Sequence, residues 1–145
     1  MLFIDTSAFV AIANRGDEYY QEAVSFLKDV KRGKTKFRRL VTSDYIVDET
    51  LTRIRFSVGY REALRWGRSI MASKAIEIER IDEEIFQEAW RLFELYTDKP
   101  LSFTDCTSIA LMEKRDIKST FAFDEDFEKV GFETLPWHTK LGSKV

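Results

Sequence analysis

The chain has few of the residues that build several familiar kinds of site. It holds one cysteine, Cys106, and one histidine, His138, among 145 residues. A single cysteine excludes an internal disulfide and fits the reducing cytosol, so we expect a cytoplasmic protein. One histidine and one cysteine do not suffice for a zinc site, and no Ser-His-Asp set is evident.

The chain also lacks a long apolar run. No stretch approaches the roughly 20 apolar residues that a membrane helix needs. The N-terminus begins directly with a strand-like run and has no basic segment before it, so we expect neither a signal peptide nor a membrane anchor. Its composition is 44% hydrophobic and 33% charged, as in globular proteins. The length predicts a single domain over residues 1–145. The net charge of −2 is uninformative about partners.

Short apolar runs alternate with stretches of helical periodicity. The predicted strands are residues 1–5, 38–42, 75–80, 119–123 and 132–135. The predicted helices are residues 6–13, 18–30, 44–59, 60–72, 82–96 and 104–115. We expect a loop over residues 97–103, which contain Pro100, and a helix cap at Thr104. Strands separated by helices favour a parallel α/β sheet with helices on both faces.

Acidic residues stand at or near the boundaries of four of these elements. They are Asp5 in MLFIDTS, Glu49 in YIVDETL, Asp105 in LSFTDCTSIAL and Asp124 in TFAFDED. Sites in open parallel sheets form beyond the carboxyl ends of the strands, so we expect these side chains to converge. A carboxylate cluster repels itself unless protons or cations neutralise it, and Mg²⁺ and Mn²⁺ prefer oxygen ligands. A metal held by carboxylates in turn suggests hydrolysis of phosphodiesters.

Each acid also has a simpler structural interpretation. Asp5 and Asp105 can serve as helix-capping or first-turn residues, because anions stabilise helix N-termini. Glu49, taken alone, has the pattern of a solvated helix residue. The acids at residues 124–126 can form an ordinary turn before a short helix. Singly these signals are weak, and their order and contexts along one chain are much more specific.

The four acidic segments together resemble the PIN domain family, and closely its VapC-type toxin ribonucleases. The matching stretches are FIDTSAFVA, VTSDYIVDETLT, KPLSFTDCTSIALM and TFAFDEDFEKVGF, which span nearly the whole chain. The resemblance implies a three-layer α/β/α, flavodoxin-like fold with a central, mainly parallel sheet. It also implies an endoribonuclease that depends on Mg²⁺ or Mn²⁺, forms a homodimer and is inhibited by a small antitoxin protein.

The resemblance also implies which residues form the site. The family's acidic quartet of catalytic and metal-binding residues corresponds to Asp5, Glu49, Asp105 and Asp124. Asp126 is the alternative to Asp124, which we favour because it directly follows the predicted strand. Thr6 and Ser7 match the small hydroxyl residues that help hold the site. We hypothesise that Asp5 and Asp105 are the principal ligands of one ion, while the other two acids complete the cluster or bind a second ion.

Other functions remain open at this point. A PIN nuclease that processes or degrades RNA without an antitoxin would use the same four acids. A phosphoryl-transfer enzyme with an aspartyl nucleophile also begins with an apolar strand ending in Asp, but that chemistry commonly uses a second Asp where this chain has Ser7. A binding module without catalysis is disfavoured because all four acids are present. The sequence does not identify the RNA target.

Basic residues form two further groups. The segment KDVKRGKTKFRR, residues 28–39, is either a surface for RNA phosphates or a solvated loop between a helix and a strand. A second group consists of the arginines between Arg53 and Arg68, which can line a phosphate groove or pair with acidic partner residues. Tyr60 and Trp66 lie among them and offer a contact for an antitoxin helix or a dimer, or pack in the core.

Overall fold

The computed structural model describes residues 1–136, and it contains one sheet of parallel strands. The strands are β1 (Leu2–Ile4), β2 (Leu40–Ser43), β3 (Ile76–Glu79), β4 (Ser119–Phe121) and β5 (Glu133–Leu135). Their order across the sheet is β3-β2-β1-β4-β5, and every neighbouring pair is parallel. The predicted parallel α/β sheet is therefore confirmed.

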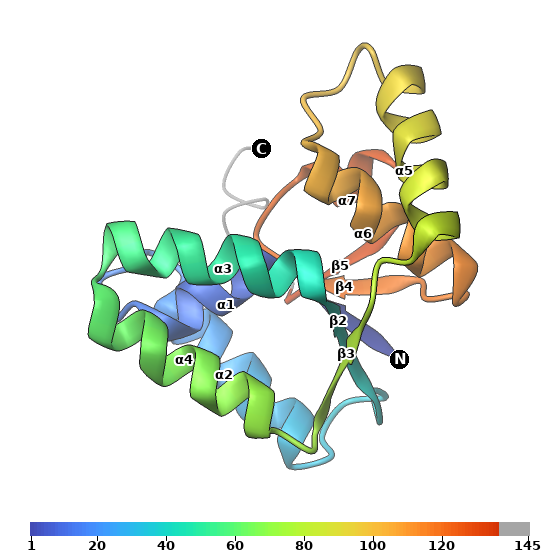
Figure 1. Ribbon diagram of the computed structural model, residues 1–145. Coiled ribbons are helices and arrows are strands. Elements are labelled where there is room, and N and C mark those ends of the chain that lie inside the picture. The colour runs from blue at the N-terminus through green and yellow to red at the C-terminus, as the bar shows by residue number, and fades with distance from the viewer. Residues whose placement is uncertain (137–145) are drawn as a thin grey trace, which may run out of the picture.

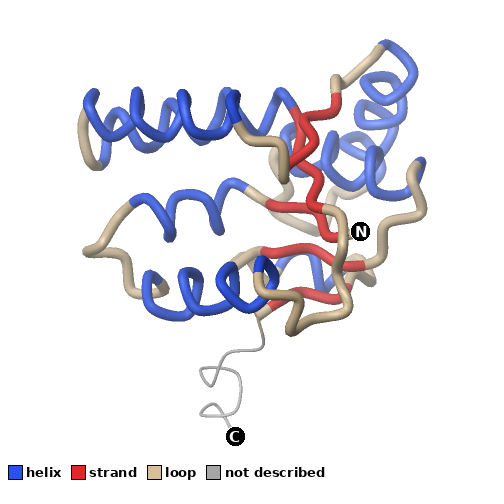
Figure 2. Tube along the Cα trace, turned by 90° about the horizontal axis from the view of Figure 1, so that it is seen from below, coloured by secondary structure: helices blue, strands red, loops and turns tan. Residues whose placement is uncertain are grey.

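The helices cover both faces of this sheet (Figures 1 and 2). They are α1 (Thr6–Ala13), α2 (Tyr20–Lys31), α3 (Asp44–Ser57), α4 (Tyr60–Ala72), α5 (Glu83–Leu95), α6 (Phe103–Lys114) and α7 (Asp126–Lys129). The chain moves outward from β1 to β3 and then returns to β4. Right-handed crossovers consequently put α1–α4 on one face and α5–α7 on the other. The three-layer α/β/α architecture is confirmed. Within residues 1–136, no helix combines the length and apolarity that crossing a bilayer requires.

The direction of the crossovers reverses between β1 and β4, which lie side by side. Phe3 pairs with Thr120 and Ile4 pairs with Phe121. Just beyond β1, the backbone N–H of Asp5 donates to the carbonyl of Phe121 over 3.0 Å. The two strands therefore end together, and the segments that follow them leave the sheet at the same place. Such a reversal point is where open α/β sheets form their binding crevices.

The central strand β1 is completely enclosed by the rest of the fold. Leu2, Phe3 and Ile4 are each at most 1% exposed, as expected for a parallel strand covered on both faces. Two threonines on the flanking strands are buried as well, and each donates its hydroxyl to a carbonyl of β1. Thr42 bonds Ile4 over 2.9 Å and Thr120 bonds Phe3 over 3.1 Å. These bonds satisfy polar groups that would otherwise be costly to bury.

Two predicted boundaries near the acids are wrong. Helix α6 is capped by Ser102, not Thr104, because Ser102 and Asp105 satisfy each other's backbone N–H groups in a capping box. The loop predicted over residues 97–103 therefore ends earlier. Strand β4 ends at Phe121, two residues before the predicted end, because the N–H of Phe123 donates to the Ser7 hydroxyl over 3.0 Å and not to a neighbouring strand.

Substitution of Phe121 tests how much the core beneath the reversal point contributes to stability. Its side chain is fully buried and makes an edge-to-face contact with Phe26, with ring centroids 4.8 Å apart. We expect Phe121→Ala to lower the free energy of unfolding by about 3–5 kcal/mol, measured by urea denaturation. Phe56 is 81% exposed and provides the matched control. Phe56→Ala should change stability by less than about 0.5 kcal/mol, and equal losses in the two variants would contradict the described core.

Candidate metal centre

Asp5 caps helix α1 immediately after β1. Its Oδ2 accepts the backbone N–H of Ser7 over 3.0 Å and the Ser7 hydroxyl over 2.7 Å. The interpretation of Asp5 as a helix cap is therefore confirmed. Asp5 is also only 4% exposed, whereas a helix cap needs no such burial. A carboxylate placed this deeply gains little from water, so it depends on its neighbours for stabilisation.

Asp105 lies in the first turn of α6, on the opposite side of the sheet from α1. One of its carboxylate oxygens, Oδ2, accepts the N–H of Ser102 over 3.0 Å. This bond fixes the carboxyl group at the amino-terminal end of the helix. The helix dipole favours negative charge at that end. The capping box thus holds Asp105 in place, and no cationic side chain among residues 1–136 forms an ion pair with it.

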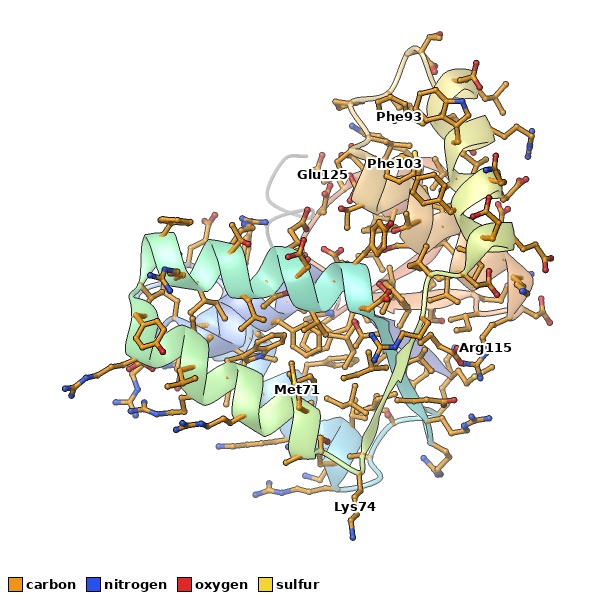
Figure 3. The ribbon with its side chains drawn as sticks, viewed as in Figure 1. Met71, Lys74, Phe93, Phe103, Arg115 and Glu125 are labelled. Carbon is orange, nitrogen blue, oxygen red and sulfur yellow. The ribbon has the colours of Figure 1, made fainter. Side chains whose placement is uncertain are left out.

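Asp124 lies in the turn after β4, and Asp126 is the first residue of α7. The N–H of Asp126 donates to Asp124 Oδ1 over 2.9 Å, so the two acids lie close together. Lys129 lies 3.7 Å from Asp126 and is the positive group closest to it in the described residues. Figure 3 shows Glu125, the residue between these two acids, beside the start of α6, where Phe103 is labelled.

Three of the acids form one compact group. Asp105, Asp124 and Asp126 each offer a carboxylate oxygen, and these oxygens all lie within 4.8 Å of one another. Asp124 and Asp126 are therefore both close to Asp105, although the sequence suggested them as alternatives. Asp5 and Glu49 are outside this closest group. The donor set is entirely carboxylate oxygen, which fits a hard divalent cation such as Mg²⁺ or Mn²⁺ and not a soft metal.

The pKa values of Asp5 and Asp105 respond to the charges of neighbouring acids. Burial raises the pKa of Asp5 to about 6, and the charges of Asp124 and Glu49 add to the increase, while the Ser7 hydrogen bonds oppose it. Burial also raises the pKa of Asp105 to about 7, with further contributions from Asp5 and Asp124. Glu49 is half-buried on α3. Charges on Asp124 and Glu49 thus raise the pKa of Asp5, and charges on Asp5 and Asp124 raise that of Asp105.

The sequence pointed to several other residues. Ser7 links Asp5 to the Phe123 backbone, so it joins the segments after β1 and β4. Thr6 is buried, and its hydroxyl has no partner within the described part of the chain. Cys106 is buried, and burial followed by the Asp105 charge raises the pKa of its thiol to about 11, which does not suit a nucleophile. His138 lies outside the described residues.

Ser102 was missed as a site residue because it was assigned to a loop. The spacing Ser-x-x-Asp at residues 102–105 is the signature of a capping box and would have identified it. The proximity of Asp126 to Asp105 has no comparable signal. It depends on the conformation of the turn after β4, where the side chain of one acid accepts the backbone N–H of another.

The fold and the acidic cluster define a class of protein. A family model for the PIN domain matches residues 2–133, so the chain belongs to the PIN domain family. Within that family it is of the VapC type. It is 30% identical over 132 residues to the 23S rRNA-specific endonuclease VapC20 of Mycobacterium tuberculosis, covering 91% of this chain and 95% of that protein.

Other comparisons agree with this assignment. A VapC ribonuclease of Archaeoglobus fulgidus is 26% identical over 125 residues, covering 86% of this chain and 77% of that protein. The crystal structure of M. tuberculosis VapC20, described as a Sarcin-Ricin loop cleaving toxin, superposes with a TM-score of 0.83 at 29% identity and covers 91% of this chain and 96% of that one. VapBC2 from Rickettsia felis shares the fold, with a TM-score of 0.69 at 10% identity over 95% of this chain and 100% of that one.

The raised pKa values predict how stability depends on pH without metal. Folded pKa values of about 6 and 7 lie above the ordinary value of 3.8. The folded state therefore binds these protons more tightly than the unfolded chain, and this stabilisation is lost as the pH rises through 6 and 7. In EDTA, Asp105→Asn should become progressively more stable relative to wild type between pH 5 and pH 8. The relative gain should be on the order of 1–2 kcal/mol.

Urea denaturation at each pH measures this difference. The asparagine retains a carbonyl oxygen that can accept the Ser102 N–H, so the capping box is preserved. A difference between the two proteins that stays constant from pH 5 to pH 8 would contradict the raised pKa of Asp105.

Ser7 should contribute to stability through its two bonds. Ser7→Ala removes the hydroxyl that donates to Asp5 and leaves the Phe123 N–H without its acceptor. We expect a loss of about 1–3 kcal/mol in the free energy of unfolding, because a partly buried donor becomes unsatisfied. Ser57→Ala is the matched control, since the Ser57 hydroxyl bonds only the exposed carbonyl of Arg53 at the end of α3. Equal, small effects in both variants would show that the Ser7 bridge is unimportant.

Proposed function

We propose that this protein is an endoribonuclease that depends on Mg²⁺ or Mn²⁺ and is the toxin of a toxin–antitoxin pair. The observation that carries the proposal is the carboxylate cluster at the reversal point of the sheet, in a chain that belongs to the PIN domain family. The buried Asp5 and the half-buried Asp105 have raised pKa values, and their negative charge carries an electrostatic cost that a divalent cation removes. Groups with perturbed pKa values cluster at functional sites, where a protein sacrifices stability for activity.

Asp105, Asp124 and Asp126 would hold the ion, with Asp5 and Glu49 completing its surroundings. When bound, a divalent ion supplies positive charge that activates water and stabilises negative charge developing on the phosphoryl and leaving oxygens. The hydrogen bonds from Ser7 and Ser102 hold two of the carboxylates in fixed orientations. A rigid arrangement of this kind reduces the reorganisation that the site must undergo when substrate arrives.

The proposed substrate is a loop of structured RNA, and ribosomal RNA is the first candidate. The support is the identity to VapC20 of M. tuberculosis, which is named a 23S rRNA-specific endonuclease. Loops present unstacked bases and an accessible backbone, which paired RNA does not.

The proposed partners are a second copy of the chain and a small antitoxin, both in the cytoplasm. Large apolar side chains are exposed on the α3–α4 pair and its ends, including Phe56, Tyr60 and Met71, which are 81%, 57% and 67% exposed. Exposed apolar surface of this kind is typical of a protein-binding face. The alternative function, RNA processing or decay without an antitoxin, uses the same acids. Growth arrest on expression, relieved by a protein encoded next to the gene, distinguishes the two functions.

Asp5→Asn tests the nuclease. Purified wild type should cleave RNA with Mg²⁺ or Mn²⁺ and should lose activity in EDTA, while Asp5→Asn should lose about 100-fold or more at the same metal concentration. Asparagine is as good a helix cap as aspartate, so the variant should fold normally. Asp48→Asn is the matched control, because Asp48 is an exposed residue beside Glu49 on α3.

The assay uses total ribosomal RNA, a tRNA pool and an unstructured oligonucleotide, with cleavage sites mapped by primer extension. Cleavage by Asp5→Asn at the wild-type rate, or wild-type cleavage that persists in EDTA, would contradict the proposed metal-dependent mechanism. Cleavage confined to ribosomal RNA would support the proposed substrate class, and cleavage confined to tRNA would replace it.

A further inference from the structure

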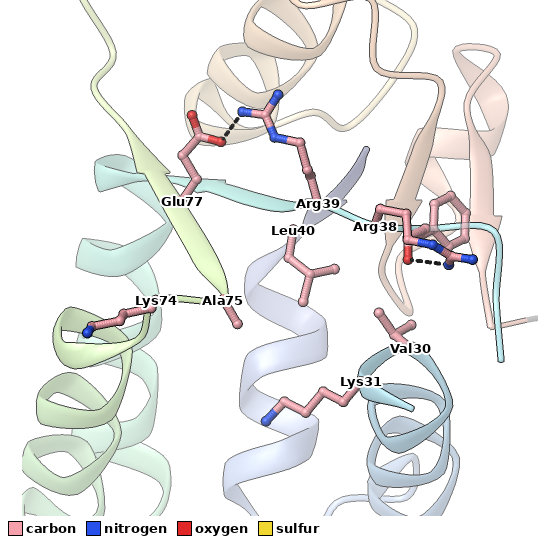
Figure 4. Close-up of a pocket in the computed structure, with 9 residues that line it drawn as sticks. Val30, Lys31, Arg38, Arg39, Leu40, Lys74, Ala75 and Glu77 are labelled. Carbon is pink, nitrogen blue, oxygen red and sulfur yellow. Dashed lines mark hydrogen bonds and ion pairs between the residues drawn. The ribbon is translucent and has the colours of Figure 1, made fainter. Parts of the chain in front are cut away.

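A basic cavity lies at the other end of the sheet from the acidic cluster. Its volume is about 600 Å³, and Figure 4 shows how three separate segments enclose it. Lys31 extends from the end of α2, Arg38 and Arg39 come from the segment that enters β2, and Lys74 comes from the connection between α4 and β3. The parallel pairing of β2 with β3 brings these segments together.

The charge of the cavity is strongly positive. Four cationic side chains line it, with Glu77 as the one carboxylate among the lining residues. Glu77 is already engaged by Arg39 at 2.8 Å and by Arg115 at 3.5 Å. Lys31 and Lys74 have no carboxylate within ion-pair distance in the described part of the chain. Two ammonium groups are consequently available to an anionic ligand, in a protein whose net charge is −2.

The cationic groups stand on a fixed framework. The guanidinium of Arg38 donates to the carbonyls of Thr35, over 2.6 Å, and Phe37, over 3.3 Å. Phe37 and Leu40 are each 6% exposed and belong to the hydrophobic core, so the backbone that carries the two arginines is anchored on both sides. The basic side chains around this anchored stretch are exposed, as both interpretations of the sequence expect.

The cavity is separate from the metal centre. It surrounds the amino-terminal ends of β2 and β3, whereas the acids follow the carboxyl ends of β1 and β4. Figure 3 shows Lys74 at the bottom of the molecule and Glu125 well above it, near Phe103. A strand of four residues such as β2 is about 13 Å long. A ligand that reaches both places must therefore be larger than a single nucleotide.

We propose that this cavity binds phosphate groups of the RNA backbone at a distance from the bond that is cleaved. The inference rests on the proposed function and extends it to a second contact with the same RNA. Residues 28–39 supply three of the cavity's cations and carry further basic side chains, of which Lys28, Arg32 and Lys34 are exposed. Cations beyond those that line the cavity suit the several phosphates of a polymer, while one small anion would need only the cavity.

The test is RNA binding by the inactive Asp5→Asn protein with two further substitutions, Lys31→Gln and Lys74→Gln. The matched control carries Arg91→Gln and Lys114→Gln, which remove the same charge from the exposed surface of α5 and α6. The probe is the RNA cleaved by wild type or, if none is cleaved, ribosomal RNA. We expect the cavity variant to bind about 10-fold more weakly at low salt. Its log–log salt slope should be smaller by about 1–2, and the control should be unchanged.

Two further experiments determine whether the cavity binds phosphates of RNA or a small phosphate compound. In the active background, the cavity variant should cleave long RNA more slowly and a short oligonucleotide containing the cleavage site at the wild-type rate. Inorganic phosphate and a mononucleotide should bind the cavity only weakly and should compete with RNA at high concentration. Thermal melting confirms that each variant is folded.

Equal RNA affinity and salt slope in the cavity and control variants would overturn the inference. Tight saturable binding of a mononucleotide that RNA does not displace would also overturn it, and would show a small-molecule site. Absence of cleavage by wild type would count against the proposed function alone, because the binding comparison uses an inactive protein. A reduced salt slope with no cleavage would thus retain the cavity as an RNA contact and reject the nuclease.

Discussion

The pairing of β1 with β4 is the constraint on which the site depends. The backbone N–H of Asp5 bonds the carbonyl of Phe121 at the point where both strands end. Because the crossovers reverse direction at this pair, the segments after the two strands diverge to opposite faces of the sheet. Asp5 leads into α1 and Asp124 leads into α7. Asp105 is on α6 and Glu49 is on α3, in the two helical layers.

Asp5 and Asp105 have a structural role in addition to the chemical role proposed for them. Asp5 caps α1 and Asp105 completes the capping box of α6, so each is stabilised by backbone N–H groups that favour a negative charge. Burial acts in the opposite direction and prevails, since the pKa values of both groups are raised. The N–H groups at the helix termini thus offset part of the free-energy cost of burying these carboxylates. The remaining electrostatic cost is the part that a divalent cation can remove.

Much of this arrangement was predictable from local patterns. The apolar runs before Asp5 and Asp124 located the strands, and their alternation with amphipathic stretches indicated a parallel sheet. Parallel topology then predicted that residues after these strands would converge. The turn conformation that brings Asp126 beside Asp105 was not predictable, because it depends on a hydrogen bond between neighbouring acids. The basic segment at residues 28–39 was evident in the sequence, but its proximity to Lys74 was not, because the pairing of β2 with β3 brings them together.

The central claim is that the carboxylates at the reversal point bind a divalent cation. The most direct measurement is anomalous diffraction from crystals of the wild-type protein grown with Mn²⁺, compared with crystals of Asp105→Asn grown in the same way. We expect a manganese peak in wild type within coordination distance, about 2.0–2.4 Å, of oxygens from Asp105 and from Asp124 or Asp126, and no such peak in the variant. No peak at this cluster in well-ordered wild-type crystals at saturating Mn²⁺ would contradict cation binding by these carboxylates.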